Sequence, residues 1–325
     1  MEVIQIIESN QVELNSDLST IDIVGLYTNI PLDHFMSVMK KLILIDHPIP
    51  QGELIIELLE FILFNNILQF NGSFFIQIFG FAMGTSFAPS GANIYLGLLE
   101  KDLKDLIASD SSLSWSKFYK RFIDDGLKIA LGSFADTLKF IELYNSLVPS
   151  INLTLESHGN SVHFLDLQIS KGYRFFHSNK FDLKTYQKPM NLYLYIPYSS
   201  NHPDYVFKNL VTIELRRYII TNSFEKDYVF MKDAFFKRLT THTINYAASK
   251  LMKWFDSIKY SDRMKMIFKQ KASISCANTQ TNQSIKGNPE NLILYKTQYD
   301  SKFQNINISK VIREEIDNAL KKPKM

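Results

Sequence analysis

Three aspartates in two short, mostly apolar segments decide how this chain is interpreted. Asp22 lies in I-D-I-V-G-L-Y-T-N-I-P (residues 21–31), and Asp124 and Asp125 lie in F-Y-K-R-F-I-D-D-G-L-K-I-A (residues 118–130). A carboxylate beside an apolar core is costly unless a cation compensates it. Mg²⁺ takes one or two carboxylates together with substrate phosphates, and two such ions about 3.5–4 Å apart serve phosphoryl transfer. The pattern therefore indicates a nucleotidyl transferase.

The second segment also predicts a hairpin. Side chains alternate along a strand, so the adjacent Asp124 and Asp125 would diverge on a regular one. Asp125-Gly126 between apolar runs is a strong hairpin signal, and a solvated turn is the alternative interpretation of the dipeptide. The two interpretations are compatible, because the tip of a hairpin can present both carboxylates to one place.

A third segment, F-I-Q-I-F-G-F-A-M-G-T-S-F-A-P-S-G-A-N-I-Y-L-G, lies between these two at residues 75–97. Its glycines, Gly80 and Gly84, tolerate positive φ and allow close approach of a ligand, with a plain strand-to-helix turn as the alternative. In order, the three segments resemble motifs A, B and C of reverse transcriptases. L-Y-T-N-I-P, A-M-G-T, R-F-I-D-D and H-F-L-D-L-Q-I are most similar to the Penelope-like retroelement polymerases, relatives of telomerase reverse transcriptase.

Two later segments extend the resemblance. K-T-Y-Q-K-P (184–189) resembles the primer grip, and S-S-N-H-P (199–203) with L-R-R (215–217) resembles the start of the thumb. The resemblance covers about residues 20–265. It implies an α+β fold, in which a polymerase palm of antiparallel strands backed by helices is followed by a helical thumb.

The resemblance also implies a division of the chain. We expect a remnant of the fingers or a leader, a palm with the primer grip, a helical thumb, and a polar linker with a basic tail, at residues 1–20, 21–195, 196–270 and 271–325. Reverse transcriptases carry a fingers subdomain before motif A, whereas 21 residues precede Asp22 here. We therefore expect a chain that is incomplete on its own, with a partner or an upstream segment supplying fingers. The G-I-Y…Y-I-G endonuclease pattern is not found.

The matching residues receive roles from the resemblance. Asp22 and Asp124 would hold two Mg²⁺ ions, with Mn²⁺ as an alternative, and the Ile23 carbonyl would complete the metal ligands. Asp125 would tune the site. Tyr27 would be the steric gate against a ribose 2′-hydroxyl, with an ordinary strand-end aromatic as the alternative.

Further contacts follow from the same resemblance. The nucleotide-binding residues would include Ile23, Tyr27, Gln77, Gly84 and Asn93. The primer grip would consist of Lys184, Tyr186 and Lys188. The alternative for Gln77 and Asn93 is an ordinary surface amide. A lysine that the family carries in I-N-L-T-L-E (151–156) is replaced by Asn152, so we expect the general acid to be absent or to come from elsewhere, such as Lys171.

Charge is distributed unevenly along the chain. Residues 1–100 have 11 acidic and 2 basic side chains (net −9), whereas residues 171–325 have 13 acidic and 27 basic (net +14). A basic half interleaved with tyrosines suits a phosphate backbone and stacked bases, and a solvated basic surface over an aromatic core is the alternative. The expected partners are an RNA template, a DNA primer and deoxynucleoside triphosphates.

The sequence contains few indications of the cellular compartment. Cys276 is the only cysteine, which rules out an internal disulfide and permits a reducing setting. The sequence has no apolar run long enough for a membrane span and no basic n-region of a secretory signal. We expect an intracellular protein, and the resemblance implies the nucleus.

Local periodicity predicts the order of the elements. We expect strands at 19–25, 73–79, 151–156 and 162–169, hairpins at 117–131 and 173–187, and helices at 33–44, 52–66, 89–106, 134–147 and across 202–270.

The function predicted from these observations is that of an RNA-directed DNA polymerase of a retroelement, transferring nucleotides to a primer 3′-hydroxyl. One alternative is an inactive or domesticated palm–thumb remnant that binds nucleic acid. Another is an unrelated metal-dependent nuclease, which explains the paired aspartates but not the third segment, Tyr27 or the thumb-like residues.

Overall fold

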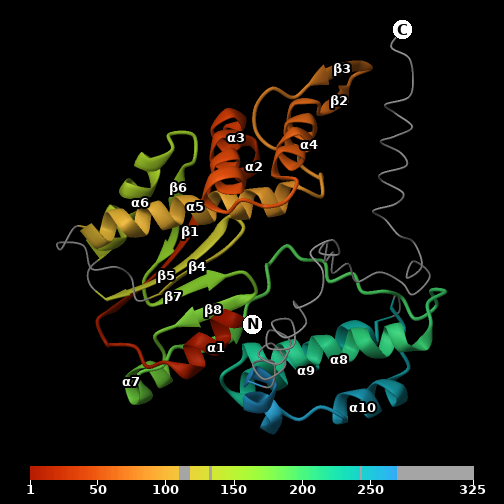
Figure 1. Cartoon of the computed structure of the whole chain (residues 1–325). Helices are drawn as coiled ribbons and strands as arrows, with labels where there is room; N and C mark the ends of the chain where they lie inside the picture. Colours follow the sequence, from red (N-terminus) through yellow and green to blue (C-terminus); the bar gives the residue numbers. More distant parts are fainter. Residues whose placement is uncertain (110–117, 132–133, 242–243, 269–325) are drawn as a thin grey trace. The chain divides into compact units, whose positions relative to one another are not determined.

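A computed structural model gives the fold of this chain (Figure 1). The described residues are 1–109, 118–131, 134–241 and 244–268, and residues 1–270 form one compact unit. The expected basic tail lies outside the described residues.

The centre of the fold is an antiparallel four-stranded sheet in the order β4-β5-β1-β6. Its strands are β1 (Ser16–Ile23), β4 (Phe118–Phe122), β5 (Asp125–Leu131) and β6 (Leu153–His158). Seven of the eight β1 residues are buried, because β1 is paired on both edges and covered on both faces. Side chains alternate between those faces, so β1 contributes to two different cores.

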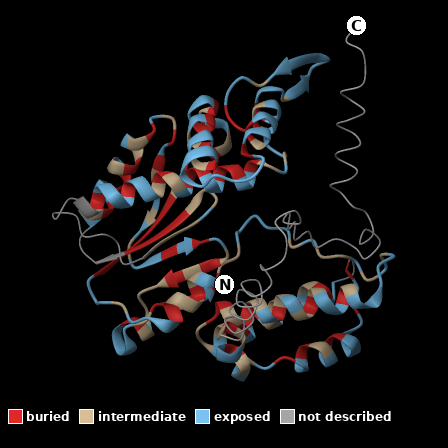
Figure 2. Ribbon diagram, in the orientation of Figure 1, coloured by how far each residue is buried: buried red, intermediate tan, exposed pale blue. Residues whose placement is uncertain are grey.

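Helices cover one face of this sheet. They are α2 (Leu26–Asn29), α3 (Leu32–Lys40), α4 (Gly52–Phe64), α5 (Ala88–Ser109) and α6 (Phe134–Leu147), with a π-helix, η1 (Lys41–Asp46), between α3 and α4. Ile21 and Ile23 of β1 pack into the core that these helices form with the sheet. Figure 2 shows the buried residues concentrated on β1 and on the inner sides of these helices.

A second, three-stranded sheet has the order β7-β8-β9 and lies on the other face of β1. It consists of β7 (Ser161–Phe164), β8 (Leu167–Ser170) and β9 (Asp182–Thr185), and it packs with α1 (Glu2–Ser9) and α7 (Tyr173–Ser178). Leu18 of β1 and Leu127 of β5 belong to this core, beside Ile4 and Ile7 of α1.

From residue 204 onward, the described residues are mainly helical. They form α8 (Asp204–Thr221), α9 (Glu225–Leu239), α10 (Ala248–Asp256) and a 3₁₀ turn, η2 (Tyr260–Asp262), around a core of their own. Aromatic rings dominate that core, with Tyr218 and Phe235 fully buried. No helix of the described residues combines the length and the apolar character that crossing a membrane requires.

The predicted fold class is confirmed: the chain is α+β, with antiparallel strands backed by helices and a helical region after them. Local predictions were wrong in the two regions that follow, and one strand was missed. Residues 162–169 form two strands joined at Leu165, which has φ 55°, and residues 173–187 form α7 and β9 in place of a hairpin. A strand at Ile67–Phe70, β2, was missed and pairs with β3 (Ser73–Ile76).

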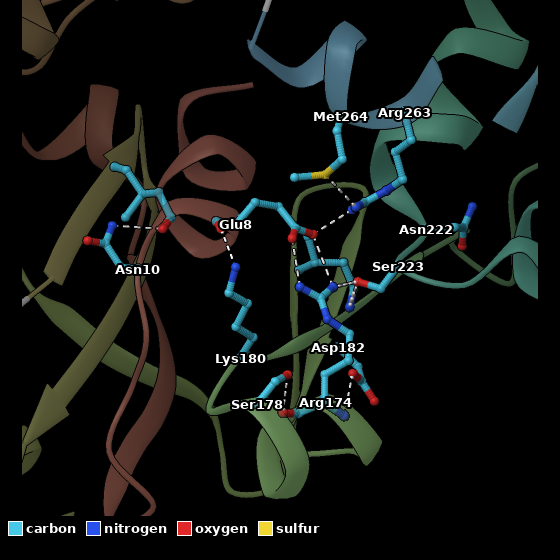
Figure 3. A network of polar contacts seen from close by, with 12 residues as sticks. Glu8, Asn10, Arg174, Ser178, Lys180, Asp182, Asn222, Ser223, Arg263 and Met264 are labelled. Carbon is cyan, nitrogen blue, oxygen red and sulfur yellow. Dashed lines mark hydrogen bonds and ion pairs between the residues drawn. The ribbon is translucent and has the colours of Figure 1, made fainter. Parts of the chain in front are cut away.

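The buried carboxylate of Glu8 ties α1 to two distant parts of the chain (Figure 3). Its oxygens lie 2.6 Å from Arg174 Nη2 and 2.6 Å from Arg263 Nη2. Arg174 also donates a hydrogen bond to Ser223, and Lys180 donates one to the Glu8 carbonyl. Burial alone would raise the pKa of Glu8, but the two guanidinium groups outweigh it and hold that pKa below its ordinary value.

We expect Glu8→Gln to lower the free energy of unfolding by about 3–5 kcal/mol, because two buried guanidinium groups lose their counter-charge. Urea denaturation at pH 7 measures this loss, and Glu2→Gln on the exposed side of the same helix is the matched control. The folded pKa of Glu8 is depressed, so its contribution is complete above the unfolded pKa and is lost as the pH falls through the folded value. A loss that persists unchanged in acid would contradict this account.

Candidate active site

Antiparallel pairing places two of the three predicted aspartates opposite each other. Asp22, near the end of β1, is opposite Asp125 at the start of β5 and opposite Thr154 of β6. Alternation turns Asp22 away from the helix-covered face, where Ile21 and Ile23 point. The carboxylates therefore lie at one end of the sheet, on the face that the helices do not cover.

The third aspartate lies in the turn between β4 and β5. This turn consists of Ile123 and Asp124, not of Asp125-Gly126 as the sequence predicted, because Asp125 pairs within β5. The Ile23 N–H donates to the Asp124 carbonyl over 3.2 Å, which fastens the turn to the end of β1. The fold thus brings together Asp22 and Asp124, which are 124 − 22 = 102 residues apart.

Burial and neighbouring negative charges make the ionisation of Asp22 and Asp125 less favourable. Burial, then the charges of Asp124 and Glu156, raise the pKa of Asp22. Burial and the charges of Asp124, Glu156 and Asp22 raise the pKa of Asp125, and Lys188 offsets part of this effect. Glu156 of β6 was not among the predicted site residues. Glu156 lies between Leu155 and Ser157, where the register of β6 against β1 shifts, so neither its place nor the pairing of β6 with β1 could be read from the sequence.

Arg121 of β4 fixes the turn from the side of α5. Its guanidinium donates to Glu100 Oε1 over 2.6 Å, to Asn93 Oδ1 over 3.0 Å and to the Ile123 carbonyl over 2.7 Å. Only 7% of the Arg121 side chain is exposed. Asn93, a predicted nucleotide contact, therefore already accepts a hydrogen bond from within the protein.

Ile123 adopts a conformation that β-branched residues avoid. Its φ is +58°, in the left-handed region, which costs about 1–2 kcal/mol for a residue with a Cβ. Such strain persists only where the surroundings enforce it, and it concentrates at functional sites. The Arg121 hydrogen bond to the Ile123 carbonyl and the Ile23 hydrogen bond to the next carbonyl supply that enforcement.

The glycine-containing segment lies against the residues that follow β1. Phe81 N–H donates to the Tyr27 carbonyl over 2.6 Å, and Gly80 has φ +74°. A Cβ on Gly80 would lie 2.5 Å from the Thr28 carbonyl oxygen, so the close approach uses its missing side chain within the protein. Gly84 also has positive φ, +89°, and a Cβ there would meet open space.

Two other predicted nucleotide contacts take part in the fold. The Gln77 amide donates to the carbonyls of Phe79 and Gly80, over 2.9 and 3.1 Å, and so holds the turn before the glycine. Tyr27, in α2, is partly buried and packs on the helix-covered core.

The predicted primer-grip residues lie in β9 and just after it. Lys184 Nζ is 3.3 Å from Asp227 Oδ1, and the Tyr186 ring stacks on His163 with a centroid distance of 4.0 Å. Lys188 is the member of this group that acts on the carboxylates, through Asp125. Lys171, the suggested source of a general acid, lies over the Phe175 ring, and the Asn152 carbonyl accepts the Val24 N–H.

The donors at this site are hard oxygens. No group of three or more His, Cys, Asp or Glu side chains is arranged for a metal ion among the described residues. Mg²⁺ does not need such a group, because one or two carboxylates suffice when phosphates and water complete its shell. Burial and neighbouring carboxylates raise the pKa values of Asp22 and Asp125. A bound divalent cation lowers the cost of ionising such carboxylates, so these residues fit Mg²⁺.

No protein-family model matches the chain, and no curated protein matches it. Several solved structures are similar in backbone. The RNA-dependent RNA polymerase of a human picorbirnavirus has a TM-score of 0.47, with 13% identity over 80% of this chain and 49% of that one. Apo telomerase from Candida tropicalis has a TM-score of 0.40, with 12% identity over 87% and 52%.

The third similar structure is the same telomerase truncated from its C-terminal domain. It has a TM-score of 0.41, with 15% identity over 56% of this chain and 37% of that one. The chain therefore spans about a third to a half of the length of these polymerases.

We expect Arg121→Lys to lower the free energy of unfolding by about 1–3 kcal/mol. The compact ammonium of lysine cannot reach the three acceptors that lie around the planar guanidinium. Urea denaturation checks this value. The matched control is Arg216→Lys, at an exposed position of α8. Equal stability of the two variants would show that Arg121 does not hold the turn.

We expect Asp22→Asn to make the protein more stable at pH 7. The folded pKa of Asp22 is raised, so the native state loses stability as the pH rises from the unfolded pKa through the folded one. The amide removes that cost, and the gain should shrink as the pH is lowered toward 4. Thermal unfolding over this pH range tests the sign, with Glu142→Gln on the exposed side of α6 as control. A destabilised Asp22→Asn protein at pH 7 would contradict the crowding of charges.

Proposed function

We propose that the chain is the palm and thumb of an RNA-directed DNA polymerase from a Penelope-like retroelement. The observation that carries the proposal is the meeting of Asp22, Asp124 and Asp125 at one end of an antiparallel sheet, with the pKa values of Asp22 and Asp125 raised. Separate carboxylates on a central strand and an adjacent hairpin suit metal-assisted nucleotidyl transfer. The proposed palm, with its primer grip, is residues 21–195, and the thumb is residues 196–270.

Asp22 and Asp124 would hold Mg²⁺ or Mn²⁺, together with the Ile23 carbonyl. Bound there, the ions would activate the primer 3′-hydroxyl and neutralise charge on the phosphates of the incoming deoxynucleotide. Asp125, paired with Asp22, would keep the negative potential that attracts the cations. Arg121 would keep the Asp124 turn in place.

The other predicted residues would position the substrates. Tyr27 follows the end of β1 and would limit space at the sugar of the nucleotide. Lys188 would bring a positive charge toward the primer phosphates beside Asp125. Gln77 and Asn93 would act on the nucleotide through the segments that they hold, since both side chains are engaged within the protein. Nuclear location belongs to the same proposal.

Primer extension with deoxynucleotides on an RNA template and Mg²⁺ tests the function. We expect Asp124→Asn to reduce extension at least about 100-fold, a loss of roughly 2.7 kcal/mol in transition-state stabilisation, because an amide holds Mg²⁺ poorly. Asp105→Asn, on the exposed part of α5, is the matched control. Equal extension by the native and Asp124→Asn chains would refute the catalytic assignment.

Two further measurements separate a polymerase from a protein that only binds nucleic acid. Mg²⁺ should raise the free energy of unfolding of the native chain, by about 2.7 kcal/mol at 100 times its Kd, and should not do so in Asp124→Asn. Binding to a primer–template measured by anisotropy should fall steeply with salt in both chains, because phosphate contacts dominate it. Binding without Mg²⁺ stabilisation or extension would favour the remnant.

A further inference from the structure

A largely apolar surface is formed by the β2–β3 hairpin and its neighbours. It comprises the outer side of α4, both strands of the β2–β3 hairpin and the two residues Ile78 and Phe79, and we call it the hairpin surface. All eight residues of β2 and β3 are exposed. The hairpin projects beyond α4 in Figure 1 and is exposed along its length in Figure 2.

The exposed side chains are large. Phe70 and Phe74 are each 72% exposed, Ile67 is 68% and Ile78 is 85% exposed. On α4 the exposed apolar residues are Leu54, Leu58, Phe61, Ile62 and Phe64. Aromatic and branched side chains at these exposures present on the order of 1,000 Å² of apolar area, above the few hundred Å² of an ordinary monomer patch. A stable complex buries about 800 Å² on each partner, so the hairpin surface is large enough for one.

The charge pattern limits what can cover this surface. Residues 61–99 contain no Asp, Glu, Lys, Arg or His, although residues 1–100 as a whole have a net charge of −9. A surface without cations does not hold a phosphate backbone, so it does not suit the nucleic acid itself. It suits an apolar polypeptide surface.

The hairpin also presents strand edges. Asn71 and Gly72 have φ of +48° and +79°, the tight turn that fixes a two-residue hairpin. In the described part of the chain, β2 and β3 pair only with each other, so each has one unpaired edge. Charged residues or prolines usually protect such an edge, and neither occurs in β2 or β3.

We propose that the hairpin surface is the interface of a homodimer, covered by the same surface of a second copy of this chain. A twofold contact places each patch against its own copy. The hairpin contributes no charge to this contact, and the exposed charges within the patch are Glu53 and Glu57 on the outer side of α4. Residues 61–99 supply matching area, matching apolar character and complementary unpaired strand edges on both sides.

Sedimentation equilibrium of the full chain tests the proposal. We expect a reversible dimer at concentrations on the order of 10 µM, in the range that interfaces of this size reach. Phe74→Lys should raise the dimer Kd at least about tenfold, because it places like charges across the twofold axis in an apolar patch. Phe230→Lys, 66% exposed on α9 and outside the patch, is the matched control and should leave the Kd unchanged.

Circular dichroism and thermal unfolding establish that each variant is folded. If Phe74→Lys fails to fold, Gln69→Lys replaces it, because Gln69 is opposite Phe74 on the same face and is already polar and exposed. A chain that stays monomeric at 100 µM, on the order of ten times the expected range, would overturn the proposal. So would equal effects of the Phe74 and Phe230 variants, or assembly that neither hairpin variant weakens.

Discussion

The pairing of β1 on both of its edges is the constraint on which the rest of this structure depends. One strand of eight residues hydrogen-bonds to β5 and β6, which begin 102 and 130 residues after its end (125 − 23 and 153 − 23). Its alternating side chains supply Ile21 and Ile23 to one core and Leu18 to the other. A change of register by one residue would exchange these faces and move Asp22 into the helix-covered core.

The buried and half-buried carboxylates differ in how far nearby positive groups compensate their charge. Glu8 is compensated by two guanidinium groups, and its pKa is depressed. Asp125 has only the partial compensation of Lys188 and Asp22 only that of the Ile23 backbone, and the pKa values of both are raised. The first arrangement stabilises the fold, whereas the second lowers stability. Sites that violate the general rules of stability in this way are where function is expected.

Arg121 contributes both to the packing of the core and to the position of the acidic turn. It compensates Glu100 on α5 and at the same time holds the Ile123 carbonyl, so a helix of the core determines where the Asp124 turn lies. The left-handed conformation of Ile123 would relax if either contact were missing, because no local preference of isoleucine supports it. The packing of α5 in the core thus determines the position of the Asp124 turn at the acidic end of the sheet.

Local sequence was sufficient for elements whose pattern is periodic, and the predicted helix at 134–147 has the bounds of α6. The acidic segments were visible in the sequence itself, and the α+β class was what the resemblance of the motifs implied. Only tertiary structure decided the turn at Ile123 and Asp124, the short helix α7 and the presence of Glu156 beside Asp22. Each of these depends on strands or side chains far away in the sequence. Periodicity reports the environment of one segment, and it carries no information on which other segment completes that environment.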